Sequence, residues 1–229
     1  MTSSAIVRPK DAASLIPFRR SNKGEIEILM GRRHVKHSFV PEYYVFPGGR
    51  VDPDDRIAIP ATDAREDVTA RVARSCGHDR AKARAFAMAA VRETYEETGL
   101  MLGKPGNHHS DQQPRSWQHV TDSGFDPDLQ CLDYVARART PTRSPIRFDA
   151  RFFVADAGNA EGNLAGSGEL EDLNWRTLKK CMELQLIDVT EFLLGEFLPD
   201  YFENPPVNET ARPVPFFCFV GLKSRVIYG

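Results

Sequence analysis

A cluster of glutamates in segment 92–100, RETYEETGL, offers the clearest chemistry in the sequence. On an α-helix, Glu93, Glu96 and Glu97 fall within about 100° of one another, because their separations are three, four and one positions. Their like charges repel one another, and the C-terminal turns of a helix disfavour anions. One interpretation is a solvated acidic face. The other is a site for a hard divalent cation, because Mg²⁺ is bound through carboxylate oxygens and keeps water and substrate phosphates as further ligands.

Two predicted elements would position these glutamates. Asp79 is the expected N-cap of a helix over Arg80–Thr98, which is rich in alanine and contains neither proline nor glycine. Gly99 suits the position after the last turn, because glycine readily adopts the left-handed conformation found there. Upstream, the β-favouring run Tyr43–Phe46 ends abruptly at the Pro-Gly-Gly of positions 47–49.

The remaining pattern predicts a single α+β domain over residues 1–229. The other predicted strands are Ala13–Arg20, Glu25–Gly31, Leu132–Arg139, Arg147–Ala155 and Leu173–Arg176, with a closing hairpin of Val214–Val220 and Ser224–Tyr228. The other predicted helices are one from an Asp63/Glu66 capping box to Ser75, then Leu178–Ile187 and Val189–Phe197. Loops are expected at Arg50–Ile59 and at Gly106–Asp128, the second with one short helix.

Composition excludes several function classes. The chain has 229 residues, 41% of them hydrophobic and 27% charged, as in an ordinary globular protein. A net charge of −2 gives no electrostatic reason to expect a nucleic-acid polymer or an anionic membrane as partner. No apolar run reaches the roughly 18–20 residues that cross a bilayer, and the N-terminus lacks the apolar core of a secretory signal. The expected location is the cytoplasm. Four scattered cysteines without a C-x-x-C pair do not form a zinc ribbon.

Segment 92–100 resembles the Nudix box of Nudix hydrolases, whose pattern is G-x5-E-x7-R-E-U-x-E-E-x-G-U. The matching residues are Arg92, Glu93, Glu96, Glu97, Gly99 and Leu100, and they follow an upstream Phe46-Pro47-Gly48-Gly49. Thr94 stands where an aliphatic residue is usual. The resemblance implies the Nudix fold, an α/β/α sandwich with a mixed central sheet.

The box is interrupted. Gly49 precedes Arg92 by 43 positions, where the family's pattern has 14, so an insertion of about 50–79 is expected before the catalytic helix. We expect it to be ordered and to shape the substrate pocket. The early glutamate of the box, which usually pairs with the box arginine, would fall at Arg84. Arg92 therefore needs another partner, either Glu66 or an aspartate of the insertion.

An interrupted box resembles the peroxisomal acyl-CoA diphosphatase branch of the family. Similar segments are Met30–Arg33 with Ser38–Pro41, Thr140-Pro141 with Arg147–Phe153, and Glu169, Glu171 and Trp175. Gly31 stands where the CoA-type signature has threonine, and the branch's peroxisomal address is missing from the SRVIYG end. Residues 177–229 are expected to be extra helices and a hairpin.

The resemblance implies a hydrolase that cleaves a diphosphate, in which Glu93, Glu96 and Glu97, with Gly49, hold Mg²⁺ or Mn²⁺. Gly48 and Gly49 would let the backbone approach substrate phosphates, although a tight turn is the alternative. As substrate contacts we expect Arg32 and Arg33, because guanidinium groups suit phosphate; ordinary strand-end charges are the alternative.

The catalytic assignment stays open between several glutamates. Glu93 is one candidate general base, and Arg92 would orient the box carboxylates. Glu169 and Glu171 lie in a Gly-rich loop that could swing in with substrate, or they could be solvated surface residues. His108 and His109 beside Asp111 suggest a metal site, but they have no second ligand pair at a known spacing.

The leading functional hypothesis is hydrolysis of CoA or acyl-CoA, with ADP-ribose or a nucleotide sugar as the alternative substrate. A hypothesis of another class is a non-catalytic nucleotide-sensing module, which would predict an eroded acidic triad. A zinc-dependent isomerase would need a Cys/His ligand set that the sequence does not assemble. The expected partner is a small-molecule nucleotide diphosphate, and a homodimer is an open possibility.

Overall fold

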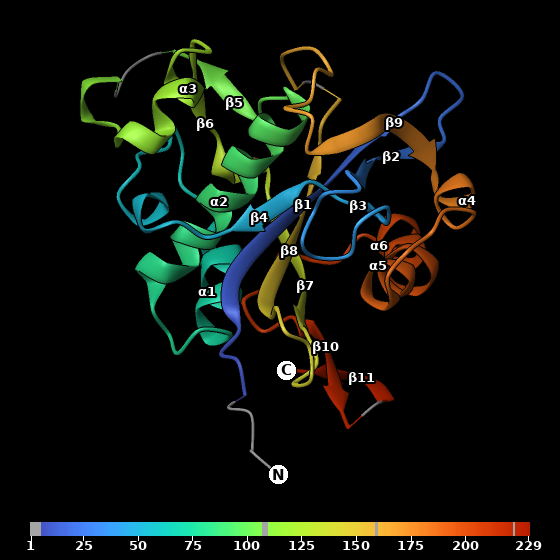
Figure 1. The fold of residues 1–229 in the computed structure, drawn as a ribbon. Coiled ribbons are helices and arrows are strands. Elements are labelled where there is room, and N and C mark those ends of the chain that lie inside the picture. The colour runs from blue at the N-terminus through green and yellow to red at the C-terminus, as the bar shows by residue number, and fades with distance from the viewer. Residues whose placement is uncertain (1–5, 107–109, 159, 222) are drawn as a thin grey trace.

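A mixed sheet of nine strands runs through the middle of the molecule (Figure 1). The computed structural model describes residues 6–106, 110–158, 160–221 and 223–229. The strand order is β11-β10-β7-β8-β1-β2-β3, with β4 paired to β1 and β9 to β2. The strands are β1 Lys10–Arg20, β2 Ile26–Arg33, β3 Tyr44–Val45, β4 Gly48–Arg50, β7 Asp133–Arg139, β8 Phe148–Asp156, β9 Leu170–Thr177, β10 Pro215–Val220 and β11 Lys223–Tyr228. The pairs β1–β8 and β10–β7 are parallel and the others antiparallel, so the sheet is mixed, as predicted.

Strand β1 lies at the centre of this sheet because it is apolar on both faces. Successive side chains of a strand point to opposite faces. Leu15 and Ile16 are both fully buried, yet Leu15 belongs to the core on one face and Ile16 to the core on the other.

Helices cover both faces and complete the predicted sandwich (Figure 1). The first layer contains α1 Glu66–Arg74 and α2 Arg80–Thr98. The second contains α4 Leu178–Cys181, α5 Asp188–Phe192, the π-helical turn Leu193–Phe197 and α6 Leu198–Glu203. Helix α4 is shorter than the predicted helix Leu178–Ile187, whereas the predicted helix Val189–Phe197 lies within the continuous helical run 188–203. The closing hairpin β10–β11 is confirmed. No helix in the described ranges is long and apolar enough to cross a membrane.

The start of α1 corrects one prediction. The helix begins at Glu66 with Arg65 as its N-cap residue, so Asp63 and Glu66 do not form a capping box. The Asp63 carboxylate instead lies 3.2 Å from Nε of Arg84 on α2. Asp63 thus pairs with α2 from the segment before α1 and does not cap α1.

The described part of the segment between α2 and β7 contains more regular secondary structure than predicted. Strands β5 Gly103–Pro105 and β6 Phe125–Pro127 form a small second sheet. Between them lie the 3₁₀ turns Ser110–Gln112 and Arg115–Trp117 and the helical turn α3 Gln118–Thr121. Trp117 is fully buried, which fixes this segment against α2. His108 and His109, considered above as metal ligands, lie outside the described residues.

Candidate active site

Helix α2 carries the acidic segment at its C-terminal end and packs against β1 and β4 (Figure 1). The predicted bounds are confirmed: the Asp79 side chain accepts a hydrogen bond from Lys82 N, and Gly99 ends the helix at φ +75°. Thr94, which stands at the usual aliphatic position, is buried and donates its hydroxyl to the Ala90 carbonyl over 2.7 Å. The hydroxyl is therefore hydrogen-bonded within the helix, and threonine at this position leaves no buried polar group unpaired.

Gly48 and Gly49 of β4 bring backbone against this acidic end. The Gly48 N–H donates to Glu97 Oε2 over 2.8 Å. A Cβ on Gly49 would collide with the Glu93 carboxylate, so glycine lets the strand and this side chain touch. A Cβ on Gly48 would lie 2.5 Å from the Ala13 carbonyl oxygen of β1, so sheet packing also requires glycine there. The tight turn considered as the alternative is thus absent, and Gly48–Arg50 form a three-residue strand that the sequence did not reveal.

Glu93 and Glu97 form a pair of interacting carboxylates, of which Glu97 is buried and Glu93 is partly buried. Burial raises the pKa of Glu97 to about 8; the Gly48 N–H opposes this shift, and the charges of Glu93 and Glu169 add to it. Burial likewise raises the pKa of Glu93 to about 7, against the effect of Arg92. A cation beside both groups would favour their charged forms.

Arg33 is a second positive charge near this pair, in addition to Arg92. Burial lowers its pKa, while Glu97, Glu169 and Glu93 oppose the shift, which places all three carboxylates within electrostatic reach of its guanidinium. Its Nη1 lies 2.9 Å from Nδ1 of His37. Its buried Nε has no hydrogen-bond partner among the described residues. Arg33 is thus held beside the acidic pair with a donor unused.

Glu96 shares Arg92 Nη1 with Glu93 and also contacts His119. Its Oε2 accepts from Arg92 Nη1 over 3.0 Å, and its Oε1 lies 2.9 Å from His119 Nε2. Burial raises its pKa, but His119 and Arg92 outweigh this effect, and the net pKa lies below the usual value. The structure therefore brings Glu93 and Glu97 together against the Gly48–Gly49 backbone and holds Glu96 between Arg92 and His119.

Arg92 is fixed by an aspartate of the insertion, one of the two partners that the sequence left open. Its Nε and Nη2 donate to Asp55, at 2.8 and 3.0 Å, and Nη2 also donates to the Arg50 carbonyl. The other candidate, Glu66, pairs with Arg80 over 2.9 Å. Sequence reasoning did not identify Asp55 itself or its further donor, Trp117.

Arg84 replaces the box glutamate with a different contact. Its Nη2 donates to the Ala58 carbonyl over 2.6 Å. It therefore holds the insertion backbone instead of Arg92. The insertion is ordered over 50–79, with a 3₁₀ turn at Pro53–Arg56 followed by α1.

The remaining predicted site residues are Arg32, Glu169 and Glu171, and only Glu169 lies near the acidic pair without an ion-pair partner of its own among the described residues. Arg32 Nη2 donates to Glu171 Oε2 over 2.9 Å across β2 and β9, so these two residues pair with each other. Glu169 is exposed and lies within electrostatic reach of Glu97. Its loop is docked on the end of α2, where Ala165 N donates to the Thr98 carbonyl over 3.1 Å. A Cβ on Gly166 would lie 2.7 Å from the Glu97 carbonyl oxygen, so this docking is close.

The donor set fits a hard divalent cation held by two carboxylates. Mg²⁺ is commonly bound by one or two protein carboxylates, with water and substrate phosphates as its other ligands. Glu93 and Glu97 supply carboxylate oxygens beside the Gly48–Gly49 backbone of β4, which suits such an ion. Over the described part of the chain, no three His, Cys, Asp or Glu side chains converge closely enough to hold a metal by themselves.

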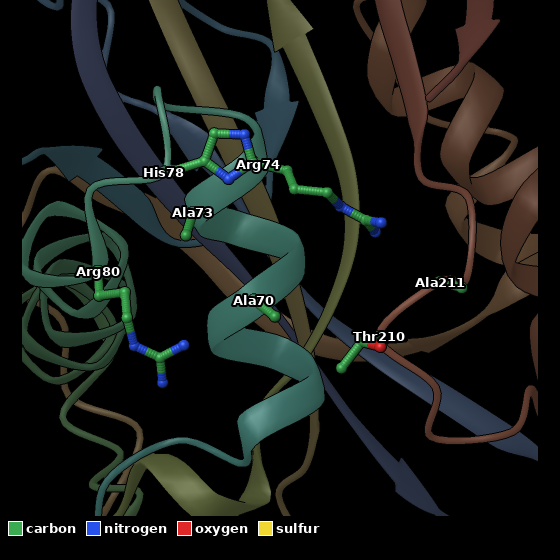
Figure 2. A pocket seen from close by; sticks show the side chains of 7 residues that line it. All are labelled: Ala70, Ala73, Arg74, His78, Arg80, Thr210 and Ala211. Atoms are coloured by element: carbon green, nitrogen blue, oxygen red, sulfur yellow. The ribbon is translucent and has the colours of Figure 1, made fainter.

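A cavity of about 490 Å³ elsewhere does not compete with this site. It lies between α1 and residues 210–211, and its lining includes Arg74, His78 and Arg80. Figure 2 shows Arg74 and Arg80 on opposite sides of α1, where they do not converge on one point. Arg80 is also occupied by its ion pair with Glu66.

Comparisons with known proteins agree with the fold. No protein-family model matches the chain. A Caenorhabditis elegans protein named "Putative nudix hydrolase 7" is 27% identical over 184 residues, which cover 76% of this chain and 53% of that protein. The chain thus spans about half the length of this relative.

Solved structures also share the architecture of this chain. A NUDIX hydrolase from Alicyclobacillus acidocaldarius shares 26% identity at a TM-score of 0.62, over 85% of this chain and 93% of that one. A C. elegans Ap4A hydrolase shares 18% identity at a TM-score of 0.47, over 85% and 98%, and is too distant to inform the substrate. The shared fold, and sequence similarity over most of this chain, support its place in the Nudix hydrolase superfamily.

Proposed function

We propose that the chain is a metal-dependent pyrophosphohydrolase that cleaves the diphosphate linkage of a nucleoside diphosphate derivative, CoA or an acyl-CoA. The observation that supports this proposal best is the burial of Glu93 and Glu97 against the Gly48–Gly49 backbone, with Arg33 beside them. In this proposal Glu93 and Glu97 hold Mg²⁺ or Mn²⁺, and Glu96 supplies a further oxygen to the ion or to its water. Residues 1–229 act as one unit.

Each residue of the site has a task in this mechanism. A bound divalent cation supplies charge neutralisation at the diphosphate and lowers the pKa of an attacking water. Arg33 directs its unused N–H toward a phosphate oxygen, which a guanidinium suits. Gly49 keeps side-chain bulk out of the space beside Glu93.

Glu169 is the general base in this proposal. A base must come within hydrogen-bond reach of the proton that it removes, either directly or through one water. Glu169 is exposed and interacts electrostatically with Glu97, whereas Glu171 is paired with Arg32. Glu93 is less suitable, because its oxygens would bind the ion and Arg92 Nη1 already lies 2.9 Å from Oε1.

The CoA assignment rests on the segments that resemble the acyl-CoA diphosphatase branch. The test is a substrate panel of CoA, acyl-CoA, ADP-ribose and a nucleotide sugar with Mg²⁺ or Mn²⁺, read by mass spectrometry. We expect 3′,5′-ADP and a phosphopantetheine product from CoA. Brisk turnover of ADP-ribose without these products would refute the CoA assignment. No turnover of any panel member, by a protein that binds these ligands, would favour a sensing module.

A further inference from the structure

His119 lies beside the acidic end of α2 although it belongs to the segment between α2 and β7. Its Nε2 is 2.9 Å from Glu96 Oε1. Its ring stacks on Tyr95, with centroids 6.0 Å apart and planes at 18°. These contacts come from outside the Nudix box and from outside the insertion that interrupts it.

The position of His119 is fixed by its neighbour Trp117. That side chain is fully buried, and its Nε1 donates to Asp55 over 3.1 Å. Asp55 in turn holds Arg92, which contacts the other oxygen of Glu96. Arg92 and His119 therefore contact the two oxygens of Glu96. The buried contacts of Asp55 with Arg92 and with Trp117 lie behind them.

We propose that His119 is a positioning residue of the candidate metal site, which holds Glu96 against Arg92 and thereby sets how tightly the site binds a divalent cation. This inference rests on the proposed metal-dependent function. Glu96 accepts a hydrogen bond from Arg92 through Oε2, and its Oε1 lies close to His119 Nε2. Each carboxylate oxygen has more than one lone pair, so Glu96 can keep both contacts and still bind an ion or its water. Residues that orient metal ligands from behind typically change metal affinity 10- to 100-fold when they are removed.

The test compares Mn²⁺ binding by the parent with that of three variants. Free Mn²⁺ is counted by electron paramagnetic resonance during titration of the parent, His119→Ala, His119→Gln and Gln118→Ala. We expect His119→Ala to bind about tenfold more weakly. His119→Gln keeps an N–H that can hold Glu96 and should recover most of the affinity. Gln118 is exposed and contacts Asp122, so Gln118→Ala should match the parent.

Melting curves in EDTA separate positioning from structural support. The His119 and Glu96 side chains are 40% and 33% exposed, and ion pairs at that exposure contribute little to stability. We therefore expect His119→Ala to melt with the parent in EDTA and to show a smaller stabilisation by Mn²⁺.

Two results would overturn the proposal. His119→Ala could bind Mn²⁺ as tightly as the parent, whether or not it melts earlier in EDTA, and His119 would then have no positioning role. A parent that fails to bind Mn²⁺ would overturn the proposed function together with this inference, so the two failures are distinguishable.

Discussion

Asp55 and Arg92 are 37 positions apart and form an ion pair with two hydrogen bonds inside the protein, Nε–Oδ1 at 2.8 Å and Nη2–Oδ2 at 3.0 Å. Asp55 is completely buried and also accepts from Asp52 N and Trp117 Nε1. Arg92 Nη1 contacts both Glu93 and Glu96. A carboxylate from the insertion thus orients the box arginine, and through it two box carboxylates.

Asp55→Asn should destabilise the protein strongly. The substitution leaves the Arg92 guanidinium buried without its full counter-charge, and breaking a buried pair in this way costs about 3–5 kcal/mol. Urea unfolding measures the loss. Asp54→Asn, on the same 3₁₀ turn, is the matched control, because its partly exposed carboxylate accepts from Ser116 Oγ and does not contact Arg92 in the described residues. Equal stability of the two variants would mean that the Asp55–Arg92 pair does not support the fold.

The elements that the sequence predicted well are those with local signals. The Asp79 side chain accepts from Lys82 N, and Gly99 adopts a left-handed backbone conformation. Both ends of α2 can therefore be predicted from the residues next to them. The two apolar faces of β1 likewise follow from adjacent side chains such as Leu15 and Ile16. The cluster of glutamates on one helix face needed no more than the spacing along the chain.

The contacts that the sequence did not reveal join segments without a regular pattern. Trp117 and His119 lie in a polar stretch with no periodicity, and their partners Asp55 and Glu96 are met only when the chain folds. Local signals cannot specify such pairs, because the same residue types also suit exposed loops. The false capping box has the same origin, since Asp63 finds a partner on another helix, Arg84.

Gly48→Ala should lower the stability of the fold, whereas Gly49→Ala should weaken Mn²⁺ binding. The Gly48 Cβ would meet the Ala13 carbonyl oxygen at 2.5 Å and Ser14 Cα at 2.6 Å, which are backbone atoms of the central strand. We expect this variant to lose stability. The Gly49 Cβ would instead meet the flexible end of Glu93, so that variant should fold but bind Mn²⁺ poorly. Thermal melting in EDTA and Mn²⁺ titration measure the two effects. Unchanged Mn²⁺ affinity in folded Gly49→Ala would contradict the prediction.

Asp149→Asn should remove a contribution to stability that depends on pH. Burial alone would raise the pKa of Asp149, but Arg137, Arg151 and Arg139 outweigh it, and the net pKa lies below the usual value. A lowered carboxyl pKa stabilises the fold above the unfolded pKa of about 4, and this stabilisation is lost as pH falls through the folded pKa.

Urea unfolding from pH 7 to pH 3 tests this linkage at Asp149. The stability gap between parent and Asp149→Asn should be widest near pH 7 and should close below about pH 4. Asp156→Asn is the control on the same strand, because Asp156 is exposed and accepts from Gly158 N. A gap that does not change with pH would show that the lost interaction is not the charge of Asp149.

Glu169→Gln and Glu171→Gln should separate the general base from a surface ion pair. If Glu169 removes the proton from the attacking water, its loss should lower kcat about 10²-fold or more, with a smaller effect on KM. Glu171 pairs with Arg32 and its side chain is 40% exposed, so its loss should leave kcat close to that of the parent. Steady-state kinetics on the panel's best substrate decide between them. The reverse order of effects would assign the base to Glu171.

Glu97→Gln should distinguish a role of Glu97 in the stability of the metal-free fold from a role in metal binding. Because burial raises the pKa of Glu97 to about 8, its neutral acid is already favoured at pH 7 in the metal-free protein. Glutamine keeps the shape, and its carbonyl oxygen can still accept from Gly48 N. In EDTA we therefore expect the variant to be as stable as the parent, or more stable by a few tenths of a kcal/mol, because glutamine removes only the minor charged form of Glu97, which Glu93 repels.

With saturating Mg²⁺ the order of stability should reverse. A ligand that binds only the folded state stabilises it by RT ln(1 + [L]/Kd), so the parent should gain and Glu97→Gln should gain much less. Hydrolysis should fall about 10²-fold or more, because charge stabilisation in the transition state is lost. Melting curves in EDTA and in Mg²⁺, beside a rate assay, measure all three effects. A variant that melts well below the parent in EDTA, yet keeps its Mg²⁺ shift and its activity, would make Glu97 a structural residue and leave Glu93 without its partner in the site.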